Sequence, residues 1–123
     1  MASKTIMIVD DSASLRQVVG IALKGAGYQV IEASDGQHAL SQLTGQKVHL
    51  IISDVNMPNM DGISFVKALK QSAAYKFTPV IMLTTESADG KKKEGQAAGA
   101  RAWVTKPFSP PQLLGAVAKL VLP

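Results

Sequence analysis

The chain contains no cysteine among its 123 residues. This absence excludes a disulfide framework, a thiolate metal site and a cysteine nucleophile. Long apolar runs are absent too: the runs at 6–9 and 80–83 are far shorter than the roughly 20 residues that span a bilayer, so no membrane insertion is expected. The first residues lead directly into a strand pattern without signal-peptide architecture. We therefore expect a soluble, cytoplasmic protein.

Charged residues are sparse. They make up 18% of the chain against 46% hydrophobic residues, the balance of an ordinary globular domain, and we expect one domain spanning residues 1–123. The net charge is +4, but the lysines are dispersed and the run at 91–93 has no interleaved aromatic residue, so no nucleic-acid partner is expected. That run is interpreted as a solvated helix face, with a docking surface for an acidic partner as the alternative.

Short apolar runs alternate with helical patterns along the chain. Five such runs occur, at 5–9, 29–33, 50–53, 79–83 and 101–104. The first, third and fourth are continuously apolar, as in parallel strands that are covered on both faces. This alternation predicts an α/β fold with a five-stranded parallel sheet of order 2-1-3-4-5 and helices on both faces.

Glycine and proline punctuate the predicted helices. Gly25 and Gly27 are expected to end the first helix and Gly45 the second, whereas Ser109 and the proline after it are expected to begin the last. The segment 86–99 carries internal glycines and three lysines, so its helix is expected to be the least firmly held.

Acidic side chains follow the first and third runs. Asp10 and Asp11 come after the first and Asp54 after the third, and these two strands are neighbours in the predicted order. Ligands of open α/β sheets bind at the carboxyl ends of the strands, so the three carboxylates are expected to converge. Two such charges about 4 Å apart repel by roughly 4 kcal/mol at an effective dielectric near 20, and a divalent cation removes this cost. All-oxygen ligands favour Mg²⁺, with positions open for a phosphoryl substrate.

The two remaining strand ends supply an alcohol and an amine. Thr84 follows the fourth run and Lys106 the fifth, and both suit the oxygens of a phosphoryl group. We expect the nucleophile to be a carboxylate, because cysteine is absent and neither His38 nor His49 is expected at the carboxyl edge.

Each of these residues has a plainer interpretation when it is taken alone. Asp10 and Asp11 could begin a helix, Thr84 could cap another, Asp54 could belong to a turn, and Lys106 could be a solvated lysine. Their joint placement at one edge of one sheet favours the site.

Four stretches of the sequence carry a family resemblance that covers essentially the whole chain. They are "IMIVDDS", "LIISDVNMPNMDG", "VIMLTTE" and "AWVTKPF". The chain resembles a response-regulator receiver domain of the stand-alone CheY type, with its flavodoxin-like fold. The resemblance implies that Asp54 accepts a phosphoryl group from the phosphohistidine of a histidine kinase. It also implies that Asp11 and Asp54 ligate Mg²⁺ directly, that Asn56 contributes its backbone carbonyl, and that Asp10 acts through bound water.

The same resemblance assigns the remaining roles. Lys106 would pair with the phosphoryl oxygens, and Thr84 would hydrogen-bond one of them and move inward as a switch residue. Trp103 stands where the family has a switching aromatic residue, more often tyrosine or phenylalanine, and a half-buried surface aromatic is the alternative interpretation. Asn56 and Glu86 flank the site at positions where the family tunes hydrolysis of the acyl phosphate.

The resemblance also implies partners and a pathway. We expect a phosphoacceptor signalling protein that is not an enzyme, and that works as a monomer in chemotaxis. Its partners would be a CheA-like histidine kinase, a flagellar-motor switch component and a phosphatase. A phosphorelay intermediate or phosphate sink is the alternative. Two other classes are disfavoured by the sequence: an aspartyl-phosphate phosphatase would need an acid where Asn56 stands, and a flavodoxin-like cofactor binder would place its phosphate against Asp10 and Asp11.

Overall fold

The computed structural model describes residues 4–55, 57, 59–84, 99–106 and 108–121. Five strands are present: β1 (Thr5–Val9), β2 (Gln29–Ala33), β3 (Leu50–Asp54), β4 (Val80–Thr84) and β5 (Ala102–Thr105). Four helices accompany them: α1 (Ala13–Gly25), α2 (Gly36–Gln42), α3 (Gly62–Lys70) and α5 (Pro110–Leu120). The helix predicted within 86–99 lies outside the described residues. Within those that are described, no helix is long and apolar enough to cross a membrane.

The strands form one parallel sheet of order β2-β1-β3-β4-β5, which confirms the predicted fold class and strand order. The first two strands have the predicted bounds, whereas β3 ends, and β4 and β5 begin and end, one residue later than predicted. Pro79 explains the start of β4, because it has no N–H to donate to a ladder. As a result Asp54 and Thr84 are the last residues of their strands rather than the first residues of loops.

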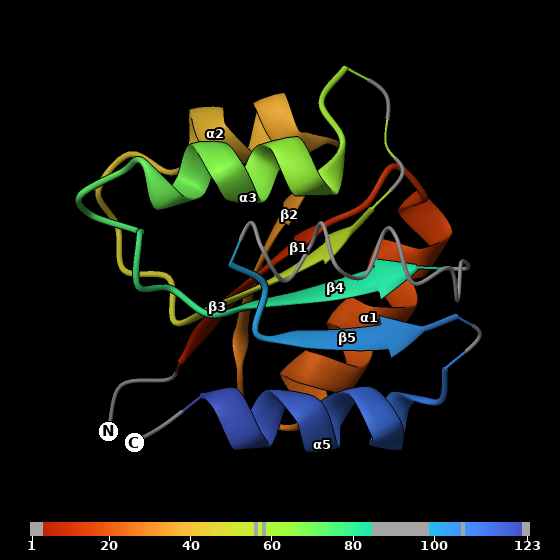
Figure 1. The fold of residues 1–123 in the computed structure, drawn as a ribbon. Helices are drawn as coiled ribbons and strands as arrows, with labels where there is room; N and C mark the ends of the chain where they lie inside the picture. The colour runs from red at the N-terminus through yellow and green to blue at the C-terminus, as the bar shows by residue number, and fades with distance from the viewer. Residues whose placement is uncertain (1–3, 56, 58, 85–98, 107, 122–123) are drawn as a thin grey trace.

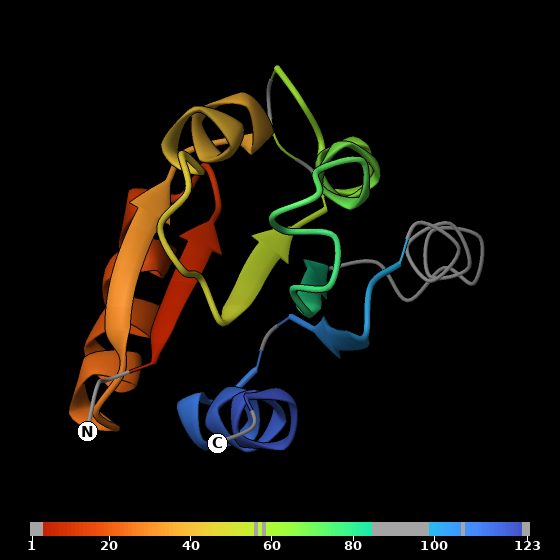
Figure 2. The same cartoon turned by 90° about the vertical axis from the view of Figure 1, so that its left-hand side faces the viewer.

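Helices cover both faces of the sheet. Figures 1 and 2 show α2 and α3 on one face and α1 and α5 on the other. Alternate residues of the same strand enter different cores: Met7 packs on the α2–α3 side and Ile8 on the α1–α5 side. Both cores are fully buried at their centres, which explains why β1, β3 and β4 are apolar except near their ends, at Thr5, Ser53, Asp54 and Thr84.

Each described helix begins with a side-chain cap. Ser12, Asp35, Asp61 and Ser109 accept hydrogen bonds from backbone N–H groups three residues further on. The prediction at Ser109 is thereby confirmed. Gly27 and Gly45, predicted near helix ends, lie just beyond α1 and α2 with φ of 96° and 113°, a backbone region that favours glycine. All four caps lie at the carboxyl edge of the sheet, because each helix follows a strand in this topology.

At the opposite edge, His49 ties the start of β1 to the segment before β3. The N–H of Thr5 donates to Nδ1 of His49 over 3.0 Å, so the ring accepts in its neutral form. Burial, followed by the charges of Lys4 and Lys47, holds the pKa of His49 below its usual 6.5.

We expect stability to fall on acidification because of His49. A lowered pKa contributes stability that is complete above pH 6.5 and is lost as the pH falls through the pKa of the folded state. His49→Asn keeps an acceptor near Thr5 but does not titrate. The free energy of unfolding of this variant should therefore fall less between pH 7 and pH 5 than that of the wild type. Urea unfolding at the two pH values measures both losses; equal losses would contradict the assignment.

Candidate functional site

Three carboxylates meet at the carboxyl edge of the sheet. Asp10 follows β1 and Asp54 ends β3, and these strands pair directly. One carboxylate oxygen from each of Asp10, Asp11 and Asp54 lies within 4.8 Å of the other two. Asp10 and Asp54 are buried, with 1% and 7% of their surfaces exposed, whereas Asp11 is exposed. The structure therefore brings together all three acids that the sequence placed at this edge.

Lys106 closes the site from the far side. Its Nζ lies 3.2 Å from Oδ2 of Asp10 and 3.3 Å from Oδ1 of Asp54. Its backbone N–H donates to the carbonyl of Thr84 over 2.6 Å, which fixes the start of the loop after β5 against the end of β4. One amine thus serves two buried carboxylates.

The groups around Asp54 do not fully stabilise its ionised form. Burial and then the neighbouring charge of Asp10 raise the pKa of Asp54 above its usual value. Lys106 and the N–H of Val55, which donates to Oδ1 over 2.9 Å, lower that pKa without cancelling the rise. A further cation at the cluster would favour the ionised carboxylate.

The donor set fits Mg²⁺. The group consists of carboxylate oxygens from three residues, two of them buried and one exposed, without nitrogen or sulfur ligands. A hard divalent cation with retained waters matches this chemistry. Asp10 already accepts from the N–H of Ser12 at Oδ1, over 2.9 Å, and from Lys106 at Oδ2.

The predicted switch residues lie on the α2–α3 side of the sheet. Thr84 is fully buried at the end of β4. Trp103 is partly buried, pairs in register with Met82 and packs against the α2–α3 core. Met82 and Thr84 are two residues apart in β4, so Trp103 and Thr84 share one face of adjacent strands. Asn56 and Glu86, the predicted hydrolysis-tuning positions, lie outside the described residues, as does the lysine run at 91–93.

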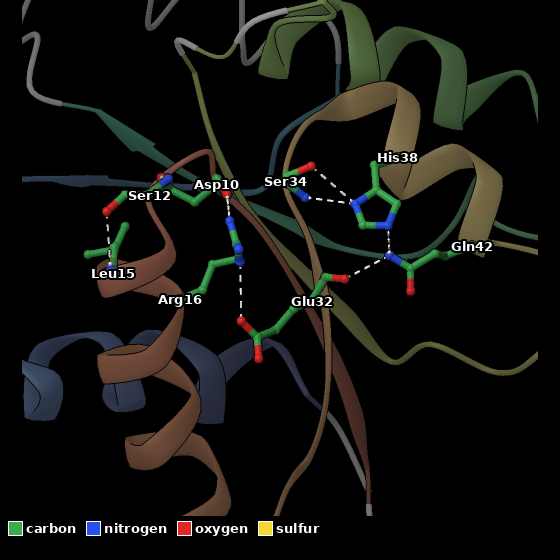
Figure 3. Close-up of polar contacts among 8 residues, drawn as sticks. All are labelled: Asp10, Ser12, Leu15, Arg16, Glu32, Ser34, His38 and Gln42. Carbon is green, nitrogen blue, oxygen red and sulfur yellow. Dashed lines mark hydrogen bonds and ion pairs between the residues drawn. The ribbon is translucent and has the colours of Figure 1, made fainter.

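Two neighbours of the site were not found from the sequence. Arg16 donates to the backbone carbonyl of Asp10, and its Nε lies 3.2 Å from Oε1 of Glu32, as Figure 3 shows. Asn59 donates to Oδ2 of Asp35 over 2.9 Å. The Arg16–Glu32 and Asn59–Asp35 contacts join residues from different βα units, and no periodic or motif signal marks such a pair.

His38 requires a correction. The sequence argument placed it away from the carboxyl edge, yet it lies in the first turn of α2, just beyond β2. Its Nδ1 accepts from the N–H of Ser34 over 3.0 Å and its Nε2 lies 3.2 Å from Nε2 of Gln42 (Figure 3). A helix that starts at this edge brings its first-turn side chains there as well. The ring is held by contacts within its own βα unit.

A family comparison accounts for this arrangement. The family model of the response regulator receiver domain matches residues 6–118. The chain therefore belongs to the receiver domains of two-component response regulators, which are phosphorylation switches.

Relatives and solved structures extend the comparison. The phosphate regulon transcriptional regulatory protein PhoB of Pseudomonas aeruginosa is 39% identical over 93% of this chain, which spans only 50% of PhoB. Chemotaxis protein CheY4 of Vibrio cholerae superimposes with a TM-score of 0.93 at 48% identity, covering 97% of this chain and 99% of CheY4. The receiver domain of sensor histidine kinase PA1611 from P. aeruginosa has a TM-score of 0.89 at 25% identity and 98% coverage of both chains; its structure holds a magnesium ion in the active site cleft.

Proposed function

We propose that this chain is a Mg²⁺-dependent phosphorylation switch that accepts a phosphoryl group on Asp54 from a histidine kinase. One observation carries the proposal: an amine and three carboxylates surround the end of β3, with Nζ of Lys106 within 3.3 Å of Asp54 and 3.2 Å of Asp10. Such a cluster combines a carboxylate nucleophile, ligands for a hard cation and a cation for the incoming oxygens.

The geometry and the family resemblance together support a set of metal ligands. Asp11 and Asp54 would hold Mg²⁺ directly, together with the backbone carbonyl of Asn56. Both oxygens of Asp10 already accept hydrogen bonds, from Ser12 and Lys106, which supports its contact through water. When bound, Mg²⁺ neutralises the carboxylates and orients the phosphoryl oxygens.

The transfer itself needs one nucleophile. A carboxylate oxygen of Asp54 attacks phosphorus, an acyl phosphate bond forms, and the bond to the donor imidazole breaks with its electron pair returning to nitrogen. Lys106 stabilises the added charge on the phosphoryl oxygens, since its amine already lies beside Asp54. Water later attacks phosphorus, the bond between phosphorus and the Asp54 oxygen breaks, and inorganic phosphate and the free carboxylate are released.

Phosphorylation is read out through the α2–α3 face of the sheet. The acyl phosphate carries about two negative charges where the carboxylate carried one. Thr84 ends the strand beside Asp54 and would donate to a phosphoryl oxygen, and Trp103, on the same face, would then repack as the switch aromatic. Thr84 would thus serve both the transfer and the switch, whereas Trp103 is not expected to alter the transfer chemistry directly.

The pathway we propose is chemotaxis. The likeness to CheY4 over nearly its whole length supports a CheY-like regulator that binds a flagellar-motor switch component and receives its phosphoryl group from a CheA-like kinase, with a phosphatase to end the signal. The phosphorelay or phosphate-sink alternative predicts phosphotransfer without any phosphorylation-dependent binding to a motor component. We propose that the protein acts as a cytoplasmic monomer that catalyses only its own phosphotransfer and dephosphorylation.

Phosphotransfer from purified histidine kinases tests the core of the proposal. Radiolabelled phosphoryl groups should move from a CheA-like kinase to this chain only when Mg²⁺ is present. A pull-down with a motor-switch component, comparing phosphorylated and unphosphorylated chain, then separates the two pathways. Transfer without phosphorylation-dependent capture would favour the relay or sink.

Lys106→Ala should separate phosphorylation from output. Removing the amine leaves the metal ligands in place, so the affinity for Mg²⁺ should change little. The increase in partner affinity that phosphorylation normally causes should be lost. Lys47→Ala, an exposed lysine at the opposite edge of the sheet, is the matched control. A variant at position 106 that keeps the full phosphorylation-dependent affinity would reject this role.

A further inference from the structure

The loop between β3 and α3 is attached to the turn before α2. Nδ2 of Asn59 donates to Oδ2 of Asp35 over 2.9 Å, and the N–H of Gly36 donates to the carbonyl of Met60 over 3.3 Å. Asp35 is 8% exposed, and its other oxygen caps α2 by accepting from the N–H of His38 over 2.8 Å. We call the Asp35–Asn59 bond and the adjacent Gly36–Met60 bond the loop clamp.

The loop clamp bridges two strands that do not touch. Asp35 follows β2 and Asn59 follows β3, and β1 lies between these strands in the sheet. β1 is the strand that leads into Asp10 and Asp11. The clamp therefore joins the segment after β2 to the segment after β3. The two segments lie on either side of β1, the strand that Asp10 and Asp11 follow.

The base of the same loop is fixed as well. The N–H of Gly62 donates to the carbonyl of Val55 over 2.8 Å, directly after Asp54. Asn59, near the tip, has φ of 66°, a conformation that only a few residue types adopt readily. With the base of the loop closed on Val55, its tip is held by the Asn59–Asp35 bond together with the Gly36–Met60 bond and the packing of Met60 against the α2–α3 core.

A charged acceptor makes this contact stronger than an ordinary side-chain bond. Asp35 accepts as a carboxylate, and hydrogen bonds to ionised groups are roughly twice as strong as neutral ones. The backbone N–H of His38 and then the amide of Asn59 lower the pKa of Asp35, so the acceptor stays ionised at neutral pH.

We propose that Asp35 is a positioning residue that acts through Asn59, fixing the described part of the loop after β3 and thereby setting the affinity of the site for Mg²⁺. The inference rests on the proposed function, because the loop matters to the metal through the backbone carbonyl expected at Asn56. Neither Asp35 nor Asn59 is itself assigned as a ligand.

Two variants of the full chain test the clamp. Asn59→Gly removes the amide, adds no charge and suits the positive φ, and it should weaken Mg²⁺ binding about tenfold, the lower end of what losing an outer-shell partner costs. The charge-conserving swap Asp35→Asn with Asn59→Asp reverses the bond, because the amide now donates from position 35. It should restore the affinity to near the wild-type value while Asn at position 35 still caps α2.

Amide chemical-shift titration with MgCl₂ gives the affinities, and thermal melting gives the stabilities of the same samples. A purely structural clamp would lower the melting temperature of Asn59→Gly and leave its Mg²⁺ affinity near that of the wild type, which overturns the inference. A swap variant as weak as Asn59→Gly overturns it too. A wild-type chain with no Mg²⁺ affinity would overturn the inference and the metal dependence of the proposed function together, whereas an unaffected Asn59→Gly variant beside a binding wild type refutes the clamp alone.

Discussion

Asp54→Asn should abolish phosphoryl labelling of this chain. The amide removes the nucleophile while keeping the size of the side chain, and Asp10 is poorly placed to replace it, because both of its carboxylate oxygens accept hydrogen bonds, from Ser12 and Lys106. Incubation with a small-molecule phosphodonor and Mg²⁺, followed by intact mass measurement, should show no added phosphoryl group. Labelling that persists would mean that Asp54 is not the acceptor.

Asp61→Asn provides the matched control for this loss. It makes the same acid-to-amide change seven residues further on, and either side chain can cap α3 by accepting from the N–H of Ser64. Its labelling should equal that of the wild type. Loss of labelling in both variants would point to a general effect on folding rather than to the acceptor.

Asp54→Asn should also stabilise the metal-free protein. A raised pKa means that Asp54 contributes stability in full below its usual value of 3.8 and loses that contribution as the pH rises through the pKa of the folded state. The ionised carboxylate is thus unfavourable to the fold at neutral pH. Asp54→Asn should therefore raise the free energy of unfolding near pH 7 in the presence of a chelator, and the gain should vanish near pH 3.

Gly62→Ala should be among the most damaging single substitutions in the chain. A Cβ at this first residue of α3 would lie 2.1 Å from the backbone carbonyl oxygen of Asp54 and 2.9 Å from Cε of Met82. The methionine can turn away, but the carbonyl belongs to the strand end that carries the acceptor. We expect a loss of about 3 kcal/mol in the free energy of unfolding, the upper range for overpacking, measured by urea denaturation.

Gly115→Ala is the control with the opposite sign. This glycine lies in α5, and a Cβ there would meet nothing within 4 Å. Alanine is favoured over glycine in a helix by about 0.5–1 kcal/mol, so this variant should be more stable than the wild type. Equal effects at the two glycines would show that contact with Asp54 does not set the requirement at position 62.

The fold could be predicted because its signals are local and repeated. Continuous apolar runs, alternating with helical stripes, specify a doubly covered parallel sheet, and the chirality of crossovers restricts its order. Strand ends are less certain from sequence: Pro79 contributes a carbonyl that accepts from Ile51 but has no N–H, so the run looks one residue longer than β4. The segment 86–99 stays a prediction.

Only those site residues that lie at strand ends or in family motifs could be predicted from the sequence. Asp10, Asp11, Asp54 and Lys106 all follow directly from the carboxyl-edge rule. Contacts between neighbouring loops at this edge could not be predicted from the sequence. The Asp35–Asn59 bond, for example, depends on where two loops lie in space and on the positive φ of Asn59. The roles of Asn56, Glu86, Thr84 and Trp103 stay predictions.

The sheet divides the interior into two hydrophobic clusters. A side chain that shrinks on the α1–α5 side, such as Ile8, can be compensated by growth of a neighbour like Leu23, but not by any change at Met7 beyond the sheet. The two halves are therefore free to drift independently in evolution. The proposed phosphotransfer at the shared edge can stay unchanged while either outer surface changes to bind a new partner protein.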